Sequence, residues 1–308
     1  MAKILVITSL PDPHVDMVQN YLPEGIEFCF YDPSELSKSD GMTVYENGSI
    51  NLLNKDSPLS VWYRKPKFLC EEDLISMNNI PEVYIQSISS MNVEGYSLVF
   101  GAYPNCLWVS NPYSIKKASN KLMQLSFART FGFDVPKTIF SSRFEDINDF
   151  RLEVGDIVMK PLGFPYVKTN GKSHWLYATL ITKSQKINYE GLSVTPMIFQ
   201  QKINKIFDLR VTVIGNEVFG CRIYSEYLDS RKAAGRYFPV DLQDTFVKQC
   251  LNMVKSLGLN FGAFDFVQST DGNLYFLEIN PNGQWGFIEK KTNLPLSKAM
   301  ANLLISSS

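Results

Sequence analysis

Two carboxylates and an amide near the carboxyl end of the chain have the residue types and spacing of a metal site. Asp265 lies in one apolar, aromatic run, Glu278 and Asn280 lie in the next, and Asp271-Gly272 separates the runs. An Asp-Gly pair in this position predicts a β-hairpin with a two-residue turn. This register places Asp265 opposite Glu278, where Cβ atoms are ~5 Å apart and like charges repel. Asn280 follows on the same face.

A divalent cation would relieve the repulsion predicted in this hairpin. Carboxylate and amide oxygens are hard ligands that suit Mg²⁺, which fills its remaining positions with water and substrate phosphates. The alternative is an edge hairpin whose carboxylates point to solvent. The apolar residues beside them, among them Phe264 and Phe276, favour a packed hairpin. We therefore predict Asp265, Glu278 and Asn280 as metal ligands.

Lysines and glycines in the middle of the chain suggest a phosphate site. Lys160 ends a predicted strand over residues 157–159, and the loop after it contains Gly163, Gly171 and Lys172. Exposed backbone N–H groups and movable ammonium groups suit phosphate oxygens. The spacing matches neither of the common glycine-rich phosphate motifs, so composition alone supports this interpretation.

Two arginines lie on a second predicted hairpin, whose turn is Gly215-Asn216. Guanidinium groups bind γ-phosphate or carboxylate oxygens in a bidentate manner. The predicted register puts Arg210 and Arg222 on opposite faces of the sheet. The spacing of Asp208-Leu209-Arg210 resembles that in the ATP-grasp ligases, and on this resemblance we rank Arg210 first as a catalytic residue, with Arg222 as its partner or as a clamp for an acidic substrate.

The elements that must position these groups indicate a chain of the α/β (α+β) class. Strand, helix and strand alternate over residues 3–31, which predicts a parallel α/β unit. A helix is expected over 114–131 and a loop over 284–295. Arg64-Lys65 ends another strand, where the two cations either meet an anionic ligand or are solvated.

Composition narrows the functional classes. The 308 residues carry 30 Lys and Arg against 31 Asp and Glu, so no basic excess predicts a nucleic-acid partner. The amino terminus lacks an apolar run long enough for a signal peptide or membrane span. Five scattered cysteines favour a reduced, cytoplasmic location. The chain has only two histidines, which makes a Ser-His-Asp hydrolase an unfavoured interpretation.

The order Asp265, Glu278-x-Asn280 resembles the metal signature of the ATP-grasp ligases. The longer run LEINPNGQWGF, residues 277–287, is similar to their graspetide synthetase subgroup, the microviridin-type peptide macrocyclases. This resemblance implies an ATP-grasp fold, in which an N-terminal α/β domain at 1–113 precedes two ATP-clasping lobes at 114–197 and 198–308. It implies ATP and Mg²⁺ as cofactors.

The resemblance also assigns roles to residues that periodicity leaves open. Lys121, a surface lysine by periodicity, becomes a phosphate contact together with Lys160 and Lys172. Adenine contacts fall on the run at 200–203, and many relatives have a glutamate where Gln201 stands. The implied nucleotide-binding residues are Lys121, Lys160, Lys172, Gln200, Gln201, Lys202, Ile203, Asp208 and Arg231; the implied catalytic residues are Arg210, Arg222 and Lys160.

The subgroup resemblance implies a reaction and a partner. A precursor peptide, with a leader and an acidic, Thr-rich core, would have its Asp or Glu side chains phosphorylated and closed onto Thr or Ser hydroxyls as omega-esters. Other interpretations are an ATP-grasp ligase that adds amino acids by amide bonds, and a nucleotide-binding regulator without catalysis. The resemblance leaves ester or amide linkage open, and a homodimer is one assembly that it allows.

Overall fold

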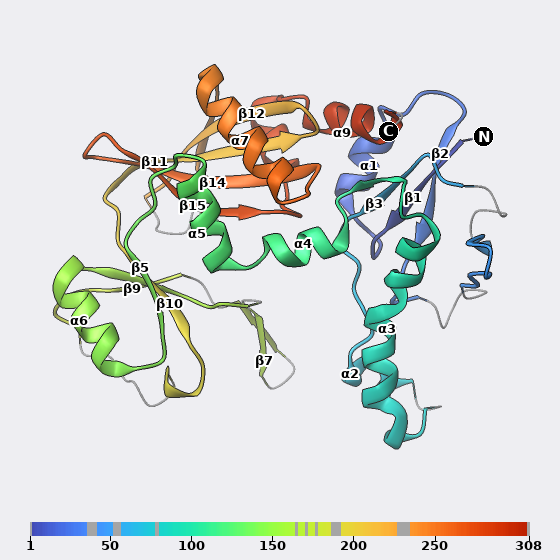
Figure 1. The fold of residues 1–308 in the computed structure, drawn as a ribbon, viewed down its shortest axis with the longest axis horizontal. Coiled ribbons are helices and arrows are strands. Elements are labelled where there is room, and N and C mark those ends of the chain that lie inside the picture. The colour runs from blue at the N-terminus through green and yellow to red at the C-terminus, as the bar shows by residue number, and fades with distance from the viewer. Residues whose placement is uncertain are drawn as a thin grey trace.

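The structure, a computed structural model, contains a parallel sheet, two antiparallel sheets and a two-stranded ribbon (Figure 1). It describes residues 2–35, 42–51, 57–77, 80–163, 166–169, 172–175, 178–185, 192–226 and 235–306. The mixture of parallel and antiparallel sheets confirms the predicted fold class.

The N-terminal sheet is parallel, in the order β2-β1-β3-β4. Its strands are β1 (Ala2–Ile7), β2 (Ile26–Tyr31), β3 (Ser60–Tyr63) and β4 (Leu107–Val109). Residues 4–7 are fully buried, as expected of an apolar run covered on both faces. The helices of this part are α1 (Pro13–Gln19), α2 (Glu71–Ser76) and α3 (Glu82–Ala102).

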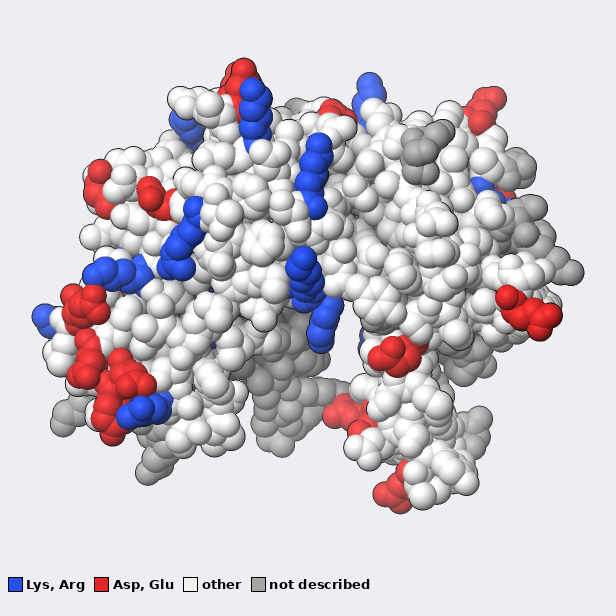
Figure 2. Space-filling model, in the orientation of Figure 1, with Lys and Arg blue, Asp and Glu red and all other residues white. Residues whose placement is uncertain are grey.

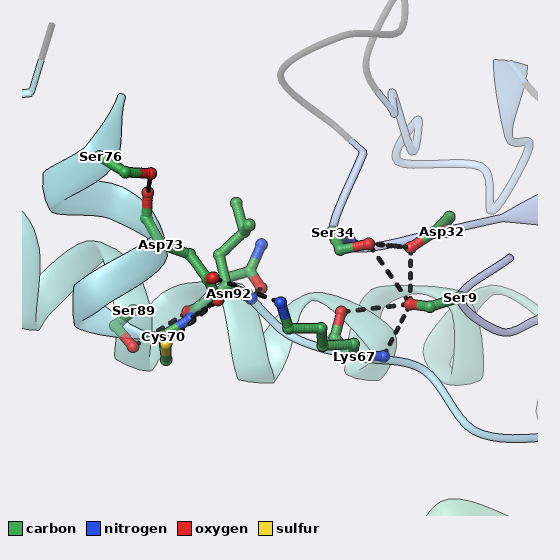
Figure 3. Close-up of polar contacts among 10 residues, drawn as sticks. Ser9, Asp32, Ser34, Lys67, Cys70, Asp73, Ser76, Ser89 and Asn92 are labelled. Atoms are coloured by element: carbon green, nitrogen blue, oxygen red, sulfur yellow. Dashed lines mark hydrogen bonds and ion pairs between the residues drawn. The ribbon is translucent and has the colours of Figure 1, made fainter. Parts of the chain in front are cut away.

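A polar network fastens the α2–α3 region to the ends of the N-terminal strands (Figure 3). The Ser9 hydroxyl donates to Asp32 at 2.8 Å and accepts the Lys67 backbone N–H at 2.8 Å. Lys67 Nζ lies 3.2 Å from the Asp73 carboxylate on α2. The segment after β3 is therefore held against the sheet, which also fixes the residues that end β3.

The central sheet is antiparallel, in the order β5-β10-β6-β9. Its strands are β5 (Thr138–Ser141), β6 (Ile157–Lys160), β9 (Thr179–Ile181) and β10 (Met197–Gln201), beside α6 (Phe144–Val154), η2 (Leu192–Val194) and the ribbon of β7 (Tyr166–Thr169) and β8 (Lys172–Trp175). β10 runs past residue 197, where we placed a domain boundary, because it pairs with β5 and β6. The three-unit division itself remains a prediction.

The C-terminal sheet is antiparallel, in the order β13-β12-β11-β14-β15. Its strands are β11 (Lys205–Ile214), β12 (Glu217–Tyr224), β13 (Arg236–Val240), β14 (Phe261–Ser269) and β15 (Leu274–Asn280). One face packs on α5 (Lys121–Thr130) and α7 (Asp244–Ser256). The other packs on the N-terminal sheet, α8 (Gly286–Thr292) and α9 (Leu296–Ile305).

Two predictions of helices and loops are wrong. The helix expected over 114–131 is two helices, α4 (Pro112–Ala118) and α5, because Asn120 starts a new helix by accepting the Met123 N–H at 3.0 Å. The loop expected over 284–295 contains α8, whose Ile288 is buried. Packing against α1 and α9 stabilises this short helix, which has little pattern of its own.

The surface carries both signs of charge. On the face drawn in Figure 2, basic and acidic side chains are interspersed, and acidic ones gather over α6, whose first turn contains Glu145 and Asp146. This mixture agrees with the formal net charge of −1. Throughout the described ranges, every helix is too short or too polar to cross a bilayer.

Candidate active site

The predicted carboxylate pair forms, although by a different turn. Asp265 lies directly opposite Glu278. The turn has three residues rather than two, with Gly272 at φ +93°, which shifts the register by one. A β-bulge beside Asp265 shifts it back. The extra turn residue and the bulge shift the register in opposite directions, so Asp265 and Glu278 are paired as predicted.

Arg210 on β11 is the partner of Asp265. The two residues face each other across the β11–β14 ladder, and Arg210 Nη1 donates to both carboxylate oxygens at 2.8 Å. Its Nη2 donates to the Gln284 carbonyl at 3.1 Å. Only 8% of Arg210 is exposed, so three acceptors fix the direction of its guanidinium group.

Lys121 on α5 is the partner of Glu278. Its Nζ lies 2.6 Å from Glu278 Oε2. α5 reaches this position because Gln124, one turn further on, is buried and bonds the backbone of Ile279: its Nε2 donates to the carbonyl at 2.8 Å and its Oε1 accepts the N–H at 3.2 Å. A lysine that periodicity places on the surface thus becomes part of the site.

The two carboxylates are electrostatically unequal. Burial raises the pKa of Asp265 against the lowering effect of Arg210, and the nearby Glu278 charge adds to the rise. Burial also opposes ionisation of Glu278, but Lys121, Lys160 and Arg210 together lower its pKa. Side-chain exposures of 36% for Asp265 and 40% for Glu278 leave a side open to a ligand.

The donor set fits a hard divalent cation. Asp265 and Glu278 present carboxylate oxygens across one rung of the sheet, and Asn280 follows two residues later on an exposed position. The Asn280 amide oxygen accepts the Asn282 N–H at 3.2 Å. Sites that bind Mg²⁺ together with a nucleotide typically supply only a few protein oxygens, and water and phosphate oxygens complete the coordination. The metal role of all three residues is a proposal.

Lys160 reaches the same site from the central sheet. It ends β6, and its Nζ donates to Gln200 Oε1 on β10 at 2.8 Å. Gln200 in turn donates to the Thr138 hydroxyl at 3.1 Å. The charge of Lys160 also helps to lower the pKa of Glu278.

The predicted adenine segment joins the two sheets. Gln201 is the last residue of β10, its N–H bonds to Lys137, and Ile203 is half-buried in the link to β11. The Lys202 ammonium lies 3.8 Å from the Asp156 carboxylate. Asp208, on β11, accepts from Lys205 at 2.7 Å. Nucleotide contacts by these residues remain a prediction.

Of the remaining predicted residues, Arg222 lies apart from this cluster. Arg222 is exposed on the opposite face from Arg210, as its pairing with Leu209 requires, and its guanidinium carbon lies 5.1 Å from the Phe207 ring centroid. The structure thus does not bring Arg222 to the carboxylates. Lys172 begins β8, whose side chains the structure does not describe, and Arg231 falls outside the described residues.

Sequence reasoning missed a second polar cluster behind the hairpin. Arg64, which we expected to bind an anion or be solvated, is 1% exposed and donates to Asn282. His14 and Asp12 lie beside it. The run VWYRKP contained the only signal, an arginine at a strand end, and nothing in the sequence marked His14 as its neighbour.

Solved structures match this architecture along the whole chain. The Microcystis aeruginosa macrocyclase MdnC, bound with precursor peptide MdnA, is 25% identical, with full coverage of both chains and a TM-score of 0.84. A Chryseobacterium gregarium RiPP-associated ATP-grasp ligase, in complex with ADP and a leader and core peptide, is 22% identical over 99% of this chain and 96% of that one, with a TM-score of 0.84.

This protein has the fold of the peptide-modifying ATP-grasp ligases. The ATP-grasp ligase PsnB, complexed with minimal precursor, Mg and ADP, shares this fold at 22% identity, with 98% and 96% of the two chains covered and a TM-score of 0.81. These matches confirm the predicted ATP-grasp resemblance and fold.

Sequence comparison indicates the same class of enzyme. Glutathione synthetase of Anaplasma centrale is 26% identical over 214 residues, or 68% of this chain, and the match spans 63% of that protein's length. No known protein-family model matches the chain. The ATP-grasp fold and this partial match agree with the predicted class, an ATP-dependent ligase.

Proposed function

We propose that this ATP-dependent ligase modifies a ribosomally made precursor peptide, by activating Asp or Glu side chains and closing them onto Thr or Ser hydroxyls. The observation that carries the proposal is the Asp265–Glu278 pair with Arg210, Lys121 and Lys160 around it, in a chain that matches a peptide-bound macrocyclase from end to end.

The cofactors are ATP and Mg²⁺, in agreement with the ADP and Mg of the similar ligases. Asp265, Glu278 and Asn280 would hold the metal, and Lys121 and Lys160 would release their present partners to meet phosphate oxygens. ATP supplies the phosphoryl group that activates a carboxylate. The chain itself binds, orients and neutralises charge, since phosphoryl transfer asks little covalent chemistry of the protein.

Arg210 has the position of a charge-stabilising catalytic residue. Its guanidinium lies on the carboxylate pair, buried and fixed in direction. A positive group already oriented toward developing negative charge lowers the barrier without reorganisation. Before substrate binds, the Asp265 carboxylate neutralises the positive charge of Arg210.

The substrate is a peptide, as in the similar macrocyclases, and its finer chemistry belongs to the proposal. We infer an acidic, Thr-rich core that follows a leader segment, and omega-ester rather than amide closure. A cytoplasmic location and a homodimer remain predictions of the sequence. We expect the protein to bind neither nucleic acid nor membranes.

Intact mass spectrometry tests this function. The enzyme is incubated with ATP, Mg²⁺ and acidic precursor peptides from the same genomic neighbourhood. We expect stepwise loss of the mass of one water per ring, with release of ADP and phosphate. Precursors that stay at unchanged mass while ADP accumulates would contradict the proposal.

A second candidate is a ligase that adds amino acids by amide bonds. The match to a glutathione synthetase over 214 residues favours it. The same incubation, supplemented with free amino acids, distinguishes the two functions. A gain equal to one amino-acid residue would establish the second function, because ring closure within one peptide only removes water.

A further inference from the structure

The loop at residues 281–286, which follows β15 and ends on the first residue of α8, contacts Arg210 directly. The Gln284 carbonyl accepts from Arg210 Nη2 at 3.1 Å. Gly283 packs so tightly that a Cβ atom there would lie 2.8 Å from the same nitrogen and 2.7 Å from the Cβ of Ala263. The loop therefore supplies one of the three acceptors that fix the Arg210 guanidinium and leaves it little room to move.

Arg64, from the end of β3, holds the first half of the loop. Its Nη1 donates to the Asn282 carbonyl at 3.2 Å and to the Asn282 side-chain oxygen at 3.0 Å. The Asn282 amide group donates back to the Arg64 carbonyl. The guanidinium carbon also lies 5.1 Å from the centroid of the buried Trp285 ring. Arg64 makes these contacts while it is only 1% exposed.

His14, on α1, holds the second half of the loop. Its Nε2 accepts the backbone N–H groups of Trp285 at 3.2 Å and Gly286 at 3.1 Å. Both neighbours are donors, so Nε2 carries the lone pair and Nδ1 carries the proton. Nδ1 lies 3.2 Å from the Asp12 carboxylate, which is therefore its acceptor.

Asp12 joins the two holding residues. Besides binding His14, its carboxylate lies 3.4 Å from Arg64 Nε. The charge of Arg64 and the hydrogen bond from His14 lower its pKa although burial opposes this. A buried ion pair contributes little net stability, because desolvation of the two charges offsets their attraction. Stability alone therefore does not explain why these charges are buried behind the active site.

We propose that Arg64 and His14 are positioning residues that hold Arg210 in its reacting orientation through the 281–286 loop. The N-terminal domain then takes part in the reaction although it contributes no group to the carboxylate pair. This proposal depends on the catalytic role proposed for Arg210. It is separable from the identity of the peptide substrate.

The kinetic test compares Arg64→Ala and His14→Leu with Ser60→Ala. Ser60 lies on the same β3 strand and donates to the Leu304 carbonyl at 2.6 Å, so its variant loosens the domain contact without touching the loop. We expect kcat to fall about tenfold or more in the first two variants, with KM for ATP within about twofold of wild type. Ser60→Ala keeps wild-type kcat. His14→Gln, which retains an acceptor, recovers most of the loss.

A double-variant experiment separates positioning from general damage. If Arg64 acts through Arg210, Arg64→Ala lowers kcat no further in an Arg210→Ala background. Multiplicative losses would overturn the proposal. Asn282→Ala breaks the same contact at a half-buried loop residue, and it replaces Arg64→Ala if that variant does not fold.

Hydrogen–deuterium exchange gives a readout that needs no peptide. In His14→Leu, the amides of Trp285 and Gly286 exchange faster while those of β14 stay protected, and Ser60→Ala leaves both unchanged. Unchanged protection at these two amides would overturn the proposal. If no peptide is modified but the amides lose protection, the substrate class has failed and the holding of the loop stands.

Discussion

Arg210 Nη1 donates to both carboxylate oxygens of Asp265 at 2.8 Å, from strand β11 next to the β14–β15 hairpin. One arginine thereby neutralises one member of a carboxylate pair, and Lys121 neutralises the other. Each carboxylate of the pair already has a cationic partner in the protein. We therefore expect a bound metal or phosphate to replace one of these ion pairs rather than to neutralise an unpaired charge.

Loss of the Asp265 charge will remove metal-dependent activity. We expect Asp265→Asn to lower kcat by about 100-fold or more, because both the metal ligand and the acceptor of Arg210 are altered. Steady-state ADP release measures the effect. Asp271→Asn, in the exposed turn of the same hairpin, is the control and retains activity. Full ADP release by Asp265→Asn would contradict the metal-binding role proposed for Asp265.

Substitution of Arg210 by lysine will lower kcat much more than the same substitution of Arg222. Arg210→Lys keeps the charge but loses the fork that binds two acceptors, so we expect kcat to fall by about 100-fold. Arg222→Lys, on the opposite face, keeps kcat for ADP release. An equal fall in both variants would contradict the separation of the two arginines.

Removal of Lys121 will raise the pKa of Glu278. Its ammonium group helps to hold that pKa below the ordinary value of 4.5, so stability from this contact is present above 4.5 and is lost as the pH falls through the lower, folded value. In Lys121→Met, NMR titration should show Glu278 protonating at higher pH. Lys116→Met, on the neighbouring helix, is the control; an unchanged titration in Lys121→Met contradicts the pairing.

A methyl group at Gly283 will displace Arg210. Alanine there would approach both Arg210 Nη2 and the rigid Cβ of Ala263 within 3.0 Å, so the loop or the arginine must move. We expect Gly283→Ala to lower kcat while the protein stays folded by circular dichroism. Gly101→Ala, where a Cβ meets no atom within 4 Å, is the matched control and leaves kcat unchanged.

The His14 contact predicts that stability falls in mild acid. Burial lowers the pKa of His14 below its ordinary value of 6.5, against the raising effect of Asp12, and Arg64 and Lys65 also face it. Its contribution is therefore present above 6.5 and lost as the pH falls through the folded value. Urea unfolding between about pH 5 and 8 should show a smaller change in His14→Gln than in wild type. Equal changes would exclude His14 as the titrating group.

Local patterns in the sequence were enough to pair Asp265 with Glu278, two of the proposed metal ligands. The apolar runs on both sides of Asp271-Gly272 specify a hairpin, and burial of one face specifies which side chains share it. The predicted turn was too short by one residue, yet the bulge beside Asp265 restored the pairing. The register held because the alternating apolar faces, rather than the turn alone, decide it.

Contacts between segments far apart in the sequence could not be predicted from it. Lys121 has the spacing of a surface lysine, and only the docking of α5 on β15 through Gln124 turns it toward Glu278. Likewise α8 has little pattern of its own and forms where α1 and α9 cover it. Periodicity describes one element at a time, whereas these contacts exist only between elements.

The sequence by itself determined the hairpin, the pairing of Asp265 with Glu278 across it, the opposite faces of Arg210 and Arg222, and the class of fold. Backbone periodicity and turn chemistry specify such features within about 30 residues of chain. Only the tertiary structure decided that Arg210 binds Asp265, that Lys121 binds Glu278, and that Arg64 and His14 reach the 281–286 loop. These contacts join segments as many as 272 residues apart, and packing of the folded domains alone brings them together.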